Sequence, residues 1–134
     1  MLPPTALAFV GDAVHTLYIR RKTVESGYGQ YTLHQKTSGY VNARAQAEVF
    51  DALIDSGALT SDELEIARRA KNAHLHSRAK AASPADYHKA TAFESVIGYH
   101  ELTGNTARRD ELLALAVQIS ENTQQKNGKE DEQK

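Results

Sequence analysis

The sequence has no cysteine, and no apolar run in it approaches the roughly 20 residues that a membrane-spanning helix needs. Without cysteine there is no disulfide, thiolate metal site or cysteine nucleophile. The N-terminal stretch MLPPTALAFVGDAV lacks a basic region and reaches an acid too early for a signal peptide. We therefore expect a soluble, cytoplasmic protein, and its 134 residues are enough for one domain with a hydrophobic core.

The chain has almost no net charge, with 16 lysines and arginines against 17 aspartates and glutamates. The charges are unevenly spread, because residues 68–89 hold six basic side chains and one acid. A local excess of positive charge favours binding to a polyanion such as RNA, even where the net charge of the chain is close to zero. The alternative is that these side chains only form the solvated end of a helix, where cations are favoured.

Strand-like alternation and internal repeats are also lacking, and the apolar residues recur at the three- and four-residue spacings of helices. We predict an all-α domain of five or six helices. The long helices are expected at residues 5–24, 39–56, 60–73, 83–103 and 106–120. The first is apolar on most sides, which predicts a central position. The domain would span residues 1–120, and residues 121–134 would be a disordered polar tail.

Local signals mark several helix ends. Gly57 and Gly104 are typical stops. The T-x-x-E pattern from Thr60 to Glu63 has the form of a capping box, in which a side chain and a backbone amide bond reciprocally. Ser83 followed by proline is a typical helix start.

Two acids stand out because they lie in the middle of apolar helices, where burying an isolated charge is costly. Asp12 lies in LAFVGDAVHTLY, and Glu94 lies in KATAFESVIGYHEL. Ala90 and Gly98 lie one turn on either side of Glu94, so another helix or a ligand can approach its carboxylate closely. Together the two acids suggest a shared site for a hard cation such as Mg²⁺. The alternative is that each acid pairs with an arginine or caps a backbone amide.

These segments carry a family resemblance. LAFVGDAVHTLYIR resembles the signature helix of the ribonuclease III family, in which a run of the form L-E-F-L-G-D-A/S-V carries metal-binding acids. TAFESVIGY resembles the second acidic motif of that family, of the form D-x-F-E-A-x-x-G. Between them, YVNARAQAEVF and LEIARRAKNAHLHSRAK resemble segments of mini-ribonuclease III, the short bacterial branch. The resemblance covers residues 5–118 and implies a ribonuclease III endonuclease-domain-like helical bundle.

The resemblance assigns roles to individual residues. Asp12 matches the acid of the G-D pair and Glu94 the acid of the F-E pair, so both are implied to be catalytic and to bind metal. Three further family acids are replaced here, by Ala8, Ala43 and Thr91. These departures match mini-ribonuclease III, and they leave open whether one or two metal ions are bound.

The implied activity is hydrolysis of double-stranded RNA to 5′-phosphate and 3′-hydroxyl ends, in mini-ribonuclease III during maturation of the 23S ribosomal RNA precursor. Mg²⁺, or Mn²⁺, would activate a water and neutralise charge on the leaving oxygen. A homodimer would supply one site for each strand, and the apolar first helix would suit its interface. The polar tail either recruits a ribosomal protein or only adds solubility, and we expect no separate double-stranded-RNA-binding domain.

Duplex RNA is recognised more by shape and charge than by sequence, so basic side chains and a neighbouring asparagine are the candidates for binding it. They are Arg68, Arg69, Lys71, Asn72, Arg78, Lys80, Lys36 and His34. His74 and His76 lack a third ligand nearby for zinc, and are more simply RNA contacts or surface residues. Two other functions stay open: a catalytically inactive RNA-binding protein of the same fold, and a helical interaction module with no role in RNA chemistry.

Overall fold

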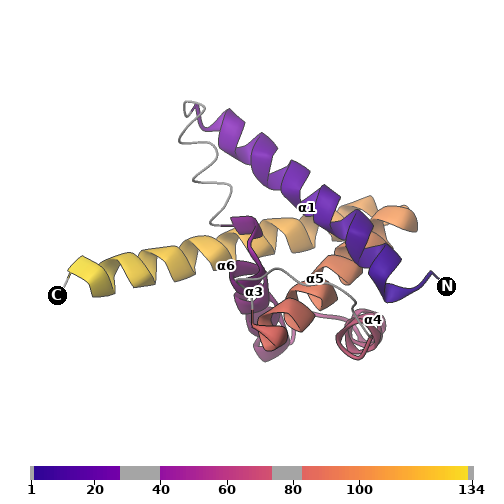
Figure 1. Cartoon of the computed structure of the whole chain (residues 1–134). Coiled ribbons are helices and arrows are strands. Elements are labelled where there is room, and N and C mark those ends of the chain that lie inside the picture. Colours follow the sequence, from indigo (N-terminus) through magenta and orange to yellow (C-terminus); the bar gives the residue numbers. More distant parts are fainter. Residues whose placement is uncertain (1, 28–39, 74–82, 133–134) are drawn as a thin grey trace.

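A computed structural model describes residues 2–27, 40–73 and 83–132, and over these ranges the chain is helical and contains no strand (Figure 1). The helices are α1 (Pro4–Glu25), α3 (Ala43–Asp55), α4 (Ser61–Lys71), α5 (Pro84–Leu102) and α6 (Thr106–Glu132). The all-α prediction is therefore confirmed, and each of the long helices expected from the sequence is present. Within the described ranges, none of the helices is both long and apolar enough to cross a membrane.

The central helix is α5, which packs against α1, α3, α4 and α6 (Figure 1). Its residues Phe93, Val96 and Ile97 are at most 2% exposed. Apolar side chains from the other four helices complete the core around it, among them Leu7, Val49, Phe50, Leu53, Ile66, Leu112 and Leu113. Glu94, which lies between these residues on α5, is thus carried by a close-packed helix.

The prediction that the first helix is central is wrong for a single chain. The buried residues of α1 recur every four positions along one face only: Leu7, Gly11, His15, Ile19 and Thr23. Phe9, Leu17 and Val24 are 82%, 59% and 61% exposed. A helix that is apolar nearly all round needs packing partners on several sides. Among the described residues of one chain, α1 buries a single face.

Two glycines allow α1 and α5 to cross with their backbones in contact. A Cβ atom on Gly11 would lie 1.7 Å from the carbonyl oxygen of Glu94, and one on Gly98 would lie 1.9 Å from the carbonyl oxygen of Leu7. No side chain fits in either place, so only glycine permits this approach. The sequence-based inference that a helix comes close to Glu94 is confirmed.

The predicted helix ends are largely confirmed. Thr60 accepts a hydrogen bond from the Glu63 amide at 3.2 Å, while the Glu63 carboxylate accepts one from the Thr60 amide at 2.8 Å, which completes the capping box. Ser83 caps α5 by accepting from the Asp86 amide at 3.1 Å. Gly57 and Gly104 both have positive φ angles, as expected where helices stop.

The end of the last helix differs from expectation. From the sequence we expect this helix to end near residue 120 and the rest to be a disordered tail, whereas α6 continues to Glu132. Polar residues do not contribute to a core, which is why burial patterns fail to predict this extension. Adding residues to an established helix avoids the cost of nucleation, however, and glutamine, lysine and glutamate are good helix formers.

Candidate active site

The helix crossing brings Asp12 of α1 and Glu94 of α5 together. Asp12 directly follows Gly11, which lies against the backbone of Glu94, and the carboxyl groups of the two acids are hydrogen-bonded to each other. Asp12 is exposed, while Glu94 is half-buried. The pair therefore lies at the surface, with one carboxyl group reaching solvent and the other partly enclosed by protein.

The electrostatics of the pair follow from this placement. Burial raises the pKa of Glu94 to about 9, with further contributions from the neighbouring Asp12 carboxylate and from the hydrogen bond between them. Glu94 is then protonated at neutral pH and donates this hydrogen bond to Asp12. Burial and the neighbouring Asp12 charge thus both favour the neutral form of Glu94.

Within the described residues, neither acid forms an ion pair with a lysine or arginine. This disfavours the reading in which each acid is held by an arginine. Over the same residues, no group of three or more histidines, aspartates or glutamates is arranged to hold a metal ion. Among the described acids and histidines, the candidate ligands at this site are thus Asp12 and Glu94.

The pair fits a hard divalent cation by its donor chemistry. Mg²⁺ binds through one or two carboxylates and fills its remaining positions with water and substrate phosphate. The three positions where the family pattern has further acids hold Ala8, Ala43 and Thr91. The Thr91 hydroxyl donates to the Tyr87 carbonyl at 2.9 Å, so it is engaged within its own helix.

The structure describes four of the eight residues predicted to bind RNA. Arg68, Lys71 and Asn72 are exposed at the end of α4 and Arg69 is half-buried. Arg68 pairs with Glu65 at 2.6 Å on the same helix. The Lys71 ammonium lies 5.8 Å from the centre of the Phe50 ring. The remaining candidates, as well as His74 and His76, lie outside the described residues: Arg78, Lys80, Lys36 and His34.

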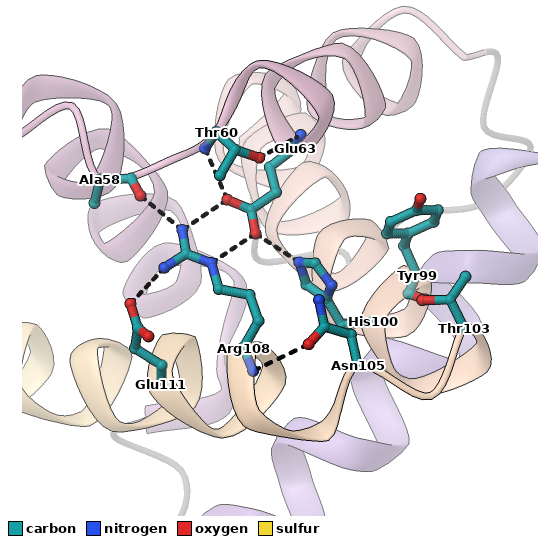
Figure 2. Close-up of polar contacts among 9 residues, drawn as sticks. All are labelled: Ala58, Thr60, Glu63, Tyr99, His100, Thr103, Asn105, Arg108 and Glu111. Carbon is teal, nitrogen blue, oxygen red and sulfur yellow. Dashed lines mark hydrogen bonds and ion pairs between the residues drawn. The ribbon is translucent and has the colours of Figure 1, made fainter.

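The structure also shows a buried polar cluster that sequence reasoning missed (Figure 2). The Glu63 carboxylate, only 1% exposed, accepts hydrogen bonds from Arg108 at 2.8 and 2.7 Å and from His100 at 2.5 Å. Burial alone would raise the pKa of Glu63, but the hydrogen bonds from Arg108, the Thr60 amide and His100, together with the Arg108 charge, lower it to about 2. The capping box is the only part of this cluster that local sequence indicates.

A second missed residue is His15, one turn beyond Asp12. It is 2% exposed, its ring packs edge-on against Phe93 at 5.1 Å between centres, and its Nδ1 accepts a hydrogen bond from Gln46 at 3.2 Å. Burial lowers the pKa of His15 to about 4. His15 is therefore a neutral core residue at physiological pH, and it links α1 to α3 and α5.

Comparison with known proteins bears on this site. The family model described as ribonuclease III domain matches residues 5–105, which include both Asp12 and Glu94. The chain belongs to the ribonuclease III family. This membership makes it an endoribonuclease of that type and confirms the resemblance inferred from the two acidic motifs.

Individual relatives agree with this assignment. The chain is 39% identical to the mini-ribonuclease 3 of Symbiobacterium thermophilum over 92% of its own length and 94% of the relative. It is 40% identical to the mini-ribonuclease 3 of Streptococcus pneumoniae, over 84% of this chain and 89% of that relative. A crystal structure of a Fusobacterium nucleatum protein superposes with a TM-score of 0.76 at 29% identity, over 86% of this chain and 91% of that one. Family and fold thus agree along nearly the whole chain.

Proposed function

We propose that this protein is a Mg²⁺-dependent endoribonuclease that cleaves double-stranded RNA and leaves 5′-phosphate ends. The observation that carries the proposal is the open carboxylate pair of Asp12 and Glu94, formed by two helices that touch through glycine. Burial and the Asp12 charge both disfavour the charged form of Glu94, and a bound divalent cation would offset this effect.

Asp12 and Glu94 would hold the cation, with Mn²⁺ as an alternative to Mg²⁺. When bound, the ion supplies activation of the attacking water and neutralisation of charge on the phosphate. Glu94 gives the site its rigidity, since its neighbours Phe93 and Ser95 are at most 2% exposed. Asp12 is the more exposed acid and faces the solution from which RNA arrives.

Binding of the duplex is assigned to the end of α4. Arg68, Lys71 and Asn72 are exposed there and border a groove of about 290 Å³ that is also lined by Phe50 and Leu64. Cationic side chains at a helix end bind phosphates without reading bases. This arrangement suits a substrate recognised by its shape and charge.

A homodimer is the second part of the proposal. Phe9 and Leu17 lie two turns apart on α1 and leave large apolar side chains in solvent. Exposed apolar surface of this kind marks an interaction site. Because Phe9 is one turn before Asp12, a second copy packed there would bring two carboxylate pairs into one particle, one for each RNA strand.

The natural substrate is proposed by family analogy to be the 23S ribosomal RNA precursor, processed in the cytoplasm, with a ribosomal protein as a further partner. The support is that the relatives named above are mini-ribonucleases and span nearly the same length. Cleavage of precursor stems in vitro, compared with unrelated duplexes, would show whether the chain selects this RNA.

The activity is tested with labelled duplex RNA and Mg²⁺, comparing the wild type with Asp12→Asn and Glu94→Gln. The matched control is Asp55→Asn, an exposed acid at the end of α3. Cleavage lost in the two site variants, with binding retained and the control active, supports the proposal. Wild-type binding without cleavage would select the inactive RNA-binding protein, and absence of salt-sensitive binding would select the interaction module.

A further inference from the structure

We propose that Glu63 and Arg108 are positioning residues for RNA binding, which fix the basic helix α4 relative to the carboxylate pair. The inference rests on the proposed function, since it assumes that the end of α4 contacts RNA. Its structural basis is the buried polar cluster around Glu63 (Figure 2), which includes neither Asp12 nor Glu94 and has no role in the chemistry proposed above.

The cluster joins four parts of the chain. Glu63 is the third residue of α4, and the Arg108 guanidinium, from the start of α6, donates to it through two nitrogens at 2.8 and 2.7 Å. The same guanidinium donates to the carbonyl of Ala58, before α4, at 2.7 Å and pairs with Glu111. His100, near the end of α5, supplies another donor at 2.5 Å. These bonds hold α4 against both α5 and α6.

The two ring nitrogens of His100 differ in their surroundings. Its Nε2 bonds to the Glu63 carboxylate, while its Nδ1 is buried without a hydrogen-bond partner among the described residues. The two-pronged ion pair of the cluster is the one between Glu63 and Arg108.

The remaining contacts of α4 are poorly suited to fix its orientation. Apart from Glu63, its buried residues are Ile66, Ala67 and Ala70, a narrow stripe with two small side chains. An isolated helix of 11 residues is also too short to be stable in water. A two-pronged arginine–carboxylate interaction, by contrast, has a defined geometry as well as strength. We therefore infer that the cluster fixes the orientation of α4, which its narrow apolar stripe does not.

The position of α4 matters because Glu63 and the basic residues lie on the same short helix. Arg68 and Lys71 follow Glu63 by roughly 8 to 12 Å along the axis, given the rise of a helix. A tilt of α4 at Glu63 would displace these side chains relative to RNA phosphates. Glu94, however, is fixed by the separate crossing of α1 and α5 at Gly11 and Gly98. Loosening the cluster should thus weaken RNA binding and leave the chemical step intact.

The test measures kcat and KM separately on duplex RNA, well below the unfolding temperature, for Glu63→Gln and Arg108→Lys. Glutamine keeps the size of the side chain but removes its charge, and lysine keeps the charge but loses the two-pronged geometry. We expect KM to rise on the order of tenfold in either variant, with kcat nearly unchanged. The lysine variant also covers the case in which Glu63→Gln does not fold.

The matched control is Leu113→Ala, a buried core residue of α6 beside Val14 and Tyr18 of α1. It should lower the unfolding temperature without changing KM, which separates positioning from general destabilisation. Unchanged KM in both cluster variants, or kcat falling as much as kcat/KM, would overturn the inference.

Amide hydrogen exchange tests the structural half independently of cleavage. In Glu63→Gln, protection should fall in α4 well before it falls in α5, even if the wild type has no nuclease activity. Equal loss of protection in both helices would show that the cluster does not specifically hold α4. Lost α4 protection in a chain without activity would instead reject the proposed function alone.

Discussion

A methyl group on Gly98 of α5 would lie 1.9 Å from the carbonyl oxygen of Leu7 on α1. This backbone contact, together with the one at Gly11, sets the separation of the two helices that carry Asp12 and Glu94. The proposed active site therefore depends on the absence of two side chains as much as on the presence of two carboxylates.

Gly98→Ala should force α1 and α5 apart, because the atom met is backbone and cannot rotate away. We expect a loss of about 1–3 kcal/mol in unfolding free energy, typical of overpacking, and a larger loss of RNA cleavage. Urea unfolding and cleavage assays measure the two effects. Gly57→Ala is the control: its φ of 68° is unfavourable for alanine, but nothing lies within 4 Å, so stability should fall while activity stays.

Acidification should destabilise the protein through His15. The folded pKa of about 4 lies below the value of 6.5 that His15 has when unfolded, so the unfolded state binds more protons between these values. Stability is then lost as pH falls from 6.5 toward 4, by about 2 kcal/mol between pH 7 and pH 5. Urea unfolding at the two pH values should show a smaller loss in His15→Asn. An equal loss in the variant would contradict this assignment.

Glu63 should contribute to stability in a lower pH range. Its folded pKa of about 2 lies below the value of 4.5 expected when unfolded, so its contribution is present above pH 4.5 and disappears as pH falls toward 2. The difference corresponds to ~3 kcal/mol. Thermal unfolding between pH 5 and pH 2 should show a shallower acid dependence in Glu63→Gln than in the wild type, whereas parallel curves would argue against the assignment.

Phe9→Glu should produce a monomer, because it places a charge in the centre of the proposed α1 interface, where the phenyl ring is 82% exposed in one chain. The folded domain should be little changed, since the side chain makes no core contact. Sedimentation equilibrium measures the oligomeric state. Leu102→Glu, an exposed apolar residue at the end of α5, is the control and should leave the dimer intact. A monomeric wild type would exclude the dimer.

Lys71→Gln should weaken binding to duplex RNA of any sequence and reduce the slope of log affinity against log salt by about one. Lys22→Gln provides the comparison, because Lys22 lies near the end of α1 that is distant from α4 (Figure 1). Binding titrations at several salt concentrations measure the slope. If Lys71→Gln keeps the wild-type slope, this lysine does not contact a phosphate.

Local structure could be predicted from the order of the amino acids, because caps, glycine stops and apolar spacing act within a few residues of one another. The capping box at Thr60 and Glu63 and the start of α5 after Ser83 are examples. The sequence also indicated the two acids of the site, since a charge inside an apolar helix stands out whatever the fold.

Long-range packing, by contrast, sets which helix is buried and which polar groups meet. The apolar patterns of α1 and α5 are similar, yet α5 is central and α1 exposes Phe9, because burial depends on what packs against a helix. The local sequence around Glu63 indicates only a helix cap. Its ion pair with Arg108, 45 positions away, is visible only in the folded chain. Contacts between distant residues have no local signature, and they place Glu63 in a buried ion pair and Glu94 against Asp12.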